Sequence, residues 1–188
     1  MPRLPSVSID ELSPDQRETY AHIARVRGAT DAEPSVPLPF QVLLNSPDAA
    51  AAVASLDEYL RFSSRLDSVV RETAILSTAR EMGSQYEWAH HEPLARQVGV
   101  RNEVIDSIKI GRAPMGLPAK EGVFAQAAKE MVAKGTLTDR TFEAVLHLLG
   151  PQETVDLIVL IGFYTMIVRV IDALGIELEP EFSPGLPQ

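Results

Sequence analysis

The chain has 188 residues and carries 17 Lys and Arg against 26 Asp and Glu, so its formal net charge is −9. Hydrophobic residues make up 45% and charged residues 23%, which is typical of a globular protein and not of a disordered one. The acidic balance argues against a nucleic-acid partner, because a binding face must neutralise phosphates with Lys and Arg. The sequence has no cysteine, which excludes disulfides, thiolate metal sites, iron–sulfur clusters and a thiol nucleophile within this chain.

The longest uninterrupted apolar run of the chain is shorter than a membrane-spanning helix. The longest run, LIVLIGFYTMIV at residues 157–168, has 12 residues, whereas a membrane-spanning helix needs about 20. A run of this length is typical of a buried core helix. The N-terminal stretch MPRLPSVSIDEL lacks the apolar centre of a secretory signal. We therefore expect a soluble, cytoplasmic protein with no membrane partner.

The sequence pattern predicts helices almost throughout. Ser13-Pro14-Asp15-Gln16 places a capping residue before a proline at the first helical position, and Gln16 is placed to close a capping box. Apolar residues recur at spacings of three and four, and no Asn-Gly or Asp-Gly hairpin signal separates two β-rich runs. The predicted helices span residues 14–28, 47–62, 67–82, 85–98, 101–111, 119–134, 138–149 and 151–174.

These helices are expected to form one all-α domain. Its predicted parts are an N-terminal helix with a proline-rich loop (1–39), a helical core (40–174) and an extended tail (175–188). Proline-rich stretches at 31–39 and 112–118 are expected to be connectors without regular structure. The helix at 151–174 is apolar nearly all round, which predicts a place at the centre of the fold or between subunits.

Three ionisable residues stand out on two neighbouring predicted helices. Glu72 points from the middle of the apolar face of the first helix, where a carboxylate without a partner would be strongly destabilised. Gly83 is expected to end that helix, and Ser84 is placed to cap the next. Glu87 and His91 are four residues apart on the second helix and therefore share a face. We predict that Glu72, Glu87 and His91 converge at the wall of one pocket as catalytic residues.

Structural roles explain the same residues equally well. The segment Ser84-Gln85-Tyr86-Glu87 matches the capping-box pattern, so its glutamate can be a capping residue. The Glu87–His91 pair can also be an exposed helix pair. Carboxylate and imidazole groups are both metal ligands, but their spacing here matches no standard zinc signature, and no metal is expected. Glu72 can be neutralised by one of three arginines that lie near it in the sequence: Arg65, Arg71 and Arg80.

Neighbouring side chains are candidates for substrate binding. Ser84, Trp88 and His90 lie beside the predicted catalytic residues on the second helix, although an aromatic side chain at helical spacing is more often a core residue. His90 and His91 are separated by about 100° around the helix, and the spacing leaves open which of them faces the site. Tyr164 lies in the apolar last helix and needs a hydrogen-bond partner if it is buried.

The segment EMGSQYEWAHH at residues 81–91 resembles the carboxymuconolactone decarboxylase family, which shares its fold with alkylhydroperoxidase D. The Arg71-Glu72 pair and the Gly162-Phe163-Tyr164 region are similar to further landmarks of that family. The resemblance implies an alkylhydroperoxidase D-like helical bundle that assembles as a homo-oligomer, either a trimer or a hexamer, and acts on a small-molecule substrate.

The resemblance also bears on the reaction. The peroxidase branch carries a C-x-x-C motif, whose cysteines align with Ser84 and Glu87 here, so a Cys-dependent peroxidase is not expected. The similarity to the other branch implies decarboxylation of a lactone or other enolisable acid by general acid/base catalysis, in aromatic degradation. His91 would stabilise the dienolate oxygen, and Glu87 or Glu72 would shuttle the proton. The substrate carbonyl would accept the electrons, so no cofactor is expected.

Two other functions fit these residues. One is a related lyase, isomerase or cyclase that acts on a different substrate with the same acid–base groups. The other is a non-catalytic helical oligomer, in which Glu72, Glu87 and His91 form a closed structural network. A cavity beside the three groups would favour an enzyme, and a fully packed network would favour a structural role.

Overall fold

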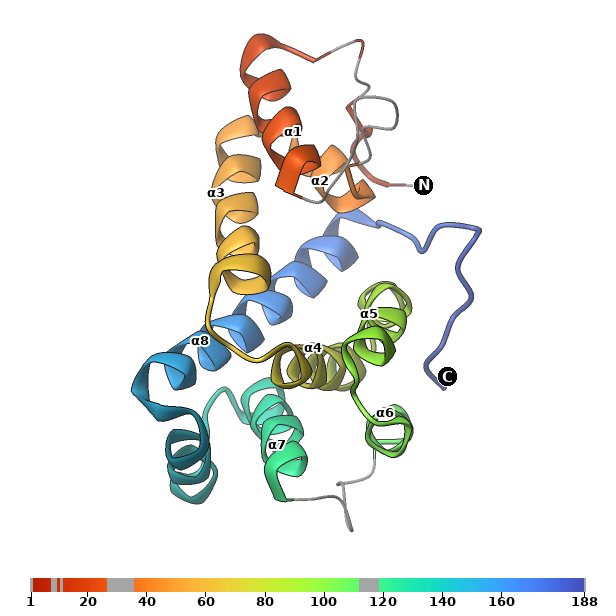
Figure 1. The fold of residues 1–188 in the computed structure, drawn as a ribbon. Coiled ribbons are helices and arrows are strands. Elements are labelled where there is room, and N and C mark those ends of the chain that lie inside the picture. Colours follow the sequence, from red (N-terminus) through yellow and green to blue (C-terminus); the bar gives the residue numbers. More distant parts are fainter. Residues whose placement is uncertain (1, 8–9, 11, 27–35, 112–118, 188) are drawn as a thin grey trace. The chain divides into compact units, whose positions relative to one another are not determined.

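The computed structural model describes residues 2–7, 10, 12–26, 36–111 and 119–187. Within these ranges the long regular elements are helices and no β-strand occurs, so the all-α prediction is confirmed (Figure 1). The chain divides into two compact units, Met1–Ser63 with Ile171–Glu177 and Ser64–Val170 with Leu178–Gln188. That both belong to a single domain stays a prediction, as does the oligomeric state. The predicted connector at 112–118 and most of the proline-rich loop lie outside the described residues.

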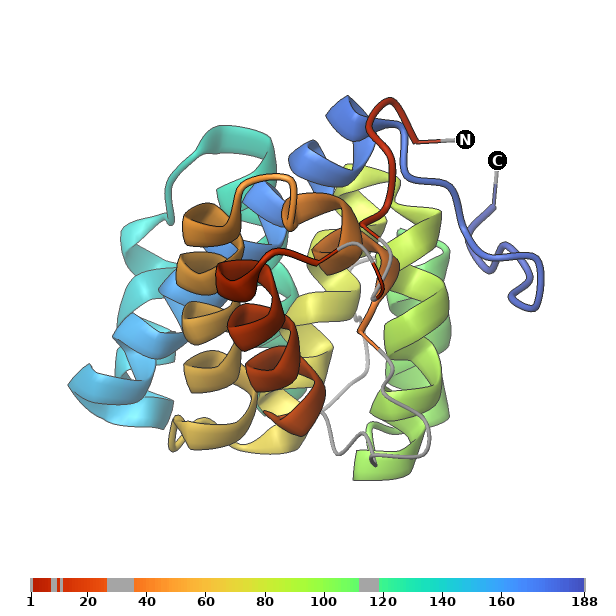
Figure 2. The ribbon, with the colours of Figure 1, turned by 90° about the horizontal axis from the view of Figure 1, so that it is seen from above.

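The first unit is built from helices α1 (Pro14–Val26), α2 (Leu38–Leu43) and α3 (Pro47–Glu58) and the π-helix η2 (Tyr59–Ser63). Figure 2 shows α1 beside α3, which it contacts. The capping box at the start of α1 is confirmed, because the Ser13 N–H donates to Gln16 Oε1 (2.8 Å) and the Gln16 N–H donates to Ser13 Oγ (3.3 Å). The extended loop predicted through Pro39 is wrong at its end. Leu38 begins α2 there, because proline is tolerated in the first turn of a helix.

The second unit contains helices α4 (Ser68–Met82), α5 (Gln85–Val98), α6 (Asn102–Lys109) and α7 (Ala119–Lys134) and most of α8 (Asp139–Leu174). The boundaries predicted for these helices are confirmed to within two residues. Helix α4 contacts α5, α6 and α7, and every residue from Glu72 to Ala79 is buried. Helix α4 therefore lies at the centre of this unit (Figure 1).

The junction of α4 and α5 is fixed by local hydrogen bonds that the sequence predicts. Gly83 ends α4 with a φ of 70°, in the left-handed region that favours glycine. Ser84 then caps α5, because its Oγ accepts the N–H of Glu87 at 3.2 Å. The predicted stop and cap are both confirmed. This short connection sets which faces of α4 and α5 meet.

Helix α8 turns sharply at Gly150, whose φ of 75° and ψ of 174° are not helical (Figure 1). The two helices predicted on either side of Gly150 are therefore both present. Beyond the turn, Leu157 and Leu160 are buried, whereas Val155 and Met166 are exposed. By length and composition alone α8 is apolar enough to cross a membrane, a property that it shares with core helices of soluble proteins.

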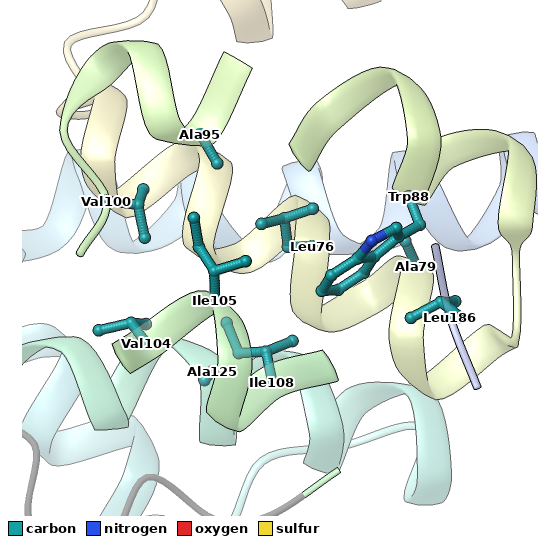
Figure 3. Close-up of a cluster of buried hydrophobic side chains, with 10 residues drawn as sticks. All are labelled: Leu76, Ala79, Trp88, Ala95, Val100, Val104, Ile105, Ile108, Ala125 and Leu186. Atoms are coloured by element: carbon teal, nitrogen blue, oxygen red, sulfur yellow. The ribbon is translucent and has the colours of Figure 1, made fainter. Parts of the chain in front are cut away.

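A hydrophobic cluster that includes Trp88 packs α4, α5, α6, α7 and the C-terminal tail together within the second unit. The indole is fully buried, with Ala79 of α4 and Leu186 of the C-terminal tail close to it (Figure 3). Complete burial of a large apolar side chain contributes about 1.5–3 kcal/mol. The cluster consists of Leu76, Ala79, Trp88, Ala95, Val100, Val104, Ile105, Ile108, Ala125 and Leu186.

Candidate active site

Helices α4 and α5 bring Glu72 and His91 into direct contact. The Oε2 atom of Glu72 lies 2.8 Å from Nδ1 of His91, and only 4% and 5% of the two side chains is exposed. An ionised Glu72 can only accept, and in that state the hydrogen bond runs from the Nδ1–H of the ring to the carboxylate. This hydrogen bond fixes the orientation of the imidazole and leaves Nε2 on the side of the ring away from Glu72.

Two further groups approach the other nitrogen of this imidazole. Nε2 of His91 lies 3.5 Å from Oε2 of Glu87, one turn earlier on α5. It also lies 3.3 Å from the hydroxyl of Tyr164 on α8. The ring of Tyr164 meets the imidazole edge to face, with centroids 5.2 Å apart. Glu72, Glu87 and His91 thus lie together, and Tyr164 joins them from a third helix. That the three groups line a pocket and act as catalytic residues stays a prediction.

Glu87 takes part in capping α5 through its backbone N–H and not through its carboxylate. Ser84 Oγ accepts the Glu87 N–H, which is one half of a capping box. The other half is not needed, because the Ser84 N–H donates to the carbonyl of Ala79 at 2.8 Å. The carboxylate of Glu87 is buried and faces His91. The exposed helix-pair interpretation is therefore wrong, since both side chains lie in the interior of the second unit.

Arg71 is the cation beside this cluster. Its Nε lies 3.6 Å from Oε1 of Glu72, and its side chain is 15% exposed. That Nε atom is buried, and within the described ranges no hydrogen-bond partner accepts from it. Of the other two candidates, Arg65 is exposed, and Nε of Arg80 donates to the carbonyl of Lys109 at 2.8 Å. The guanidinium of Arg71 therefore offsets part of the negative charge of the buried Glu72 carboxylate.

The three predicted substrate-binding residues have other contacts. Ser84 caps α5, as described above. Trp88 is a core residue, and its indole N–H donates to Glu92 at 2.7 Å. His90 turns to the tail, where its Nε2 lies 3.0 Å from Glu179 Oε2 and its ring contacts Phe182. The structure therefore selects His91 over His90 as the partner of Glu72. A substrate-binding role for Ser84, Trp88 and His90 stays a prediction.

The sequence pattern predicts the two glutamates and the histidine of this cluster but not Tyr164. The sequence does indicate that Tyr164 needs a hydrogen-bond partner, because its hydroxyl lies on a helix that is predicted to be buried. That partner is 73 residues away in the chain and becomes visible only in the fold. Across the described residues, no group of three or more His, Asp or Glu side chains is arranged to hold a metal ion.

Comparisons with known proteins support the predicted relationship. Residues 47–130 match the model of the Carboxymuconolactone decarboxylase family, and this range includes Glu72, Glu87 and His91. No curated protein matches the sequence significantly. The resemblance to this family is thus confirmed over the matched range.

Two solved structures share the fold. An uncharacterized peroxidase-related protein from Silicibacter sp. TM1040 has a TM-score of 0.72 and 17% identity, over 95% of this chain and 91% of that one. An alkylhydroperoxidase AhpD core protein, an uncharacterized peroxidase-related protein from Ralstonia eutropha JMP134, has a TM-score of 0.75 and 19% identity, over 100% of this chain and 98% of that one. The predicted alkylhydroperoxidase D-like fold is confirmed.

Proposed function

Starting from a chain whose residues 47–130 match the carboxymuconolactone decarboxylase family, we propose that this protein is a cytoplasmic, cofactor-independent decarboxylase of a lactone or other enolisable acid. One observation carries the proposal. The imidazole of His91 is buried between two carboxylates, with Glu72 at 2.8 Å from Nδ1 and Glu87 at 3.5 Å from Nε2. Such an arrangement suits general acid/base catalysis, because the ring is oriented on one side and can transfer a proton on the other.

The proposed reaction breaks the bond between the substrate carboxylate and its neighbouring carbon. Carbon dioxide leaves, and the electron pair moves into the conjugated carbonyl of the substrate to give a dienolate. The dienolate carbon then takes one proton, which the site recovers from solvent. Nε2 of His91, as N–H, stabilises the developing oxyanion or protonates the carbon, while Glu72 holds the ring and Glu87 relays the replacement proton.

Arg71 supports an acidic substrate. A guanidinium has five N–H donors, and that of Arg71 lies mostly buried beside Glu72. Donors of this kind are satisfied well by a carboxylate, which accepts two parallel hydrogen bonds from one arginine. A substrate carboxylate bound there would lie next to the Glu72–His91 pair. The net charge of −9 therefore does not weigh against an anionic substrate at this local site.

The two solved relatives are described as peroxidase-related, and that activity is the main enzymatic alternative. Thiol-dependent peroxide reduction needs a thiolate, which a chain without cysteine does not supply. A purely structural network is the remaining alternative, because a buried ion pair such as Glu72–His91 also occurs in proteins without catalytic activity. A test must therefore separate loss of turnover from loss of fold.

The experiment measures carbon dioxide release from carboxymuconolactone by the wild type, His91→Ala and Glu87→Gln. His147→Ala, which removes an exposed histidine of α8, is the matched control. Removal of a general acid or base lowers turnover by about 10²- to 10⁴-fold. We expect a loss of that size in the two site variants, with unchanged helical circular dichroism, and full activity in the control.

Two results would contradict the proposal. Turnover that persists in folded His91→Ala would remove the imidazole from the chemistry. A folded wild type that releases no carbon dioxide from carboxymuconolactone or from related lactone acids would refute decarboxylation and favour the structural network. The Glu87→Gln variant keeps its backbone N–H to Ser84 Oγ, so its unfolding would indicate that the carboxylate itself stabilises the protein.

A further inference from the structure

We propose that a pocket lined by α4, α7 and α8 binds a small, uncharged, mainly apolar molecule that carries one hydrogen-bonding oxygen. The pocket has a volume of about 350 Å³, near the lower end of the range of about 300–1,000 Å³ that is typical of small-molecule sites. All of its lining residues belong to the second unit. Its apolar lining consists of Val69, Val70, Phe124, Leu148 and Leu149.

A buried hydroxyl without a partner marks this pocket as incomplete. Thr73 lines it, is 1% exposed, and has no hydrogen-bond partner for Oγ1 among the residues that the structure describes. The next hydroxyls along α4 are satisfied, because Ser77 donates to the carbonyl of Thr73 (2.7 Å) and Thr78 donates to that of Ala74 (2.8 Å). A buried hydroxyl left unpaired destabilises the folded chain, because it has lost its hydrogen bonds to water and gained none in return. An oxygen of a bound molecule would recover that loss.

The charges around the pocket select an uncharged molecule. Among the lining residues that the structure describes, Glu121 is the one that carries a charge. Both of its carboxylate oxygens are engaged by Arg101, whose Nε lies 3.1 Å and 3.2 Å from them. An anion would be repelled by Glu121, and a cation would compete with Arg101 for it. A carbonyl or hydroxyl on an apolar frame is the chemistry that satisfies Thr73 without disturbing this ion pair.

The pocket and the candidate active site are formed by different side chains. Thr73 follows Glu72 directly, but consecutive residues of a helix point about 100° apart, so the two side chains leave α4 in different directions. No residue of the Glu72, Glu87 and His91 cluster lines the pocket. The inference therefore does not depend on the proposed decarboxylation.

The test compares two molecules of similar size, cyclohexanone and methylcyclohexane, of which only the first has a carbonyl. Binding to the full chain is followed by NMR shifts of the Leu and Val methyl groups. We expect cyclohexanone to shift the methyls of Leu148 and Leu149 and to bind about two- to tenfold more weakly to Thr73→Val, because one hydrogen bond is lost. Methylcyclohexane should bind the wild type and Thr73→Val alike.

Two further variants act as controls. Thr73→Ser keeps the hydroxyl and should retain the wild-type affinity for cyclohexanone. Thr78→Val removes a hydroxyl that already has a partner and does not line the pocket, so it should leave binding unchanged. Equal affinity of cyclohexanone for the wild type and Thr73→Val would overturn the inference. Methyl shifts that depend on protein concentration instead of ligand would also overturn it, because they would show that another copy of the chain fills the pocket.

Discussion

Glu130 provides a stability switch whose size can be worked out from its contacts. Its carboxylate, on α7, accepts hydrogen bonds from Gln126 Nε2 (2.9 Å), the Thr138 N–H (2.8 Å) and Thr141 Oγ1 (2.9 Å). Burial by itself raises the pKa of Glu130, but the hydrogen bonds outweigh burial and lower the pKa from 4.5 to about 2. The ionised side chain thus ties α7 to the start of α8.

A carboxyl group whose pKa is lower in the folded chain than in the unfolded chain stabilises the fold at pH values above its unfolded pKa. The stabilisation is complete at pH 7 and is lost as the pH falls from 4.5 towards 2. Each pH unit between the two values is worth about 1.4 kcal/mol, so Glu130 contributes at most about 3 kcal/mol at pH 7. About 2 kcal/mol of this should be gone at pH 3.

The assay is urea unfolding of the wild type and Glu130→Gln at pH 7 and pH 3. At pH 7 the variant should be less stable by about 2–3 kcal/mol, because an amide cannot accept all of these hydrogen bonds. At pH 3 the difference should shrink by about 2 kcal/mol. Glu143→Gln, an exposed glutamate of α8, is the control and should change stability by less than about 0.5 kcal/mol at either pH. If the difference between wild type and Glu130→Gln is equal at the two pH values, ionisation of Glu130 does not stabilise the folded chain.

Three further predictions follow from contacts described above or from exposed surface. Arg71→Gln should raise KM for an acidic substrate by about tenfold or more, because a charge-assisted hydrogen bond to the substrate is lost. Replacement of the exposed Arg65 by Gln is the control and should leave KM unchanged. If Arg71→Gln has the same KM as the wild type, Arg71 does not bind the substrate. Gly185→Ala should detach the C-terminal tail from Trp88, because a Cβ atom at residue 185 would lie 2.5 Å from Trp88 Cδ1. Hydrogen exchange of the backbone amides of residues 183–187 should then be faster than in the wild type. We also propose that the exposed apolar side of α8, which includes Val159, joins the subunits of a trimer or hexamer. Val159→Glu should then lower the mass of the assembly measured by sedimentation equilibrium. An unchanged mass would show that the subunits meet at another surface.

The parts of the site that the sequence predicts are those set by local rules. Gly83 and Ser84 determine where α4 ends and α5 begins, because a left-handed glycine and a capping serine act within a few residues. Helical spacing then places Glu87 and His91 on one face, and the anomaly of an acidic Glu72 on an apolar face points to a partner. The convergence of these three groups follows from two adjacent helices and a short turn.

The remaining parts depend on long-range packing. Tyr164 reaches His91 from a helix far along the chain, and no spacing rule connects them. The choice between His90 and His91 depends on the tail, since Glu179 and Phe182 contact His90. Helix α2 was not predicted, because Pro37 before it and Pro39 in its first turn are as compatible with extended structure as with a helix start.

The turn at Gly150 has a consequence for how this chain tolerates insertions. In an unbroken helix one added residue rotates every later side chain by about 100°, which would turn Tyr164 away from His91. At Gly150 the backbone already leaves the helical path, so a change of length before it can be absorbed locally. The segment that carries Leu148 and Leu149 can therefore vary in length while the register of Tyr164 is preserved. Natural variation in length is expected to concentrate before this glycine and to be rare between it and Tyr164.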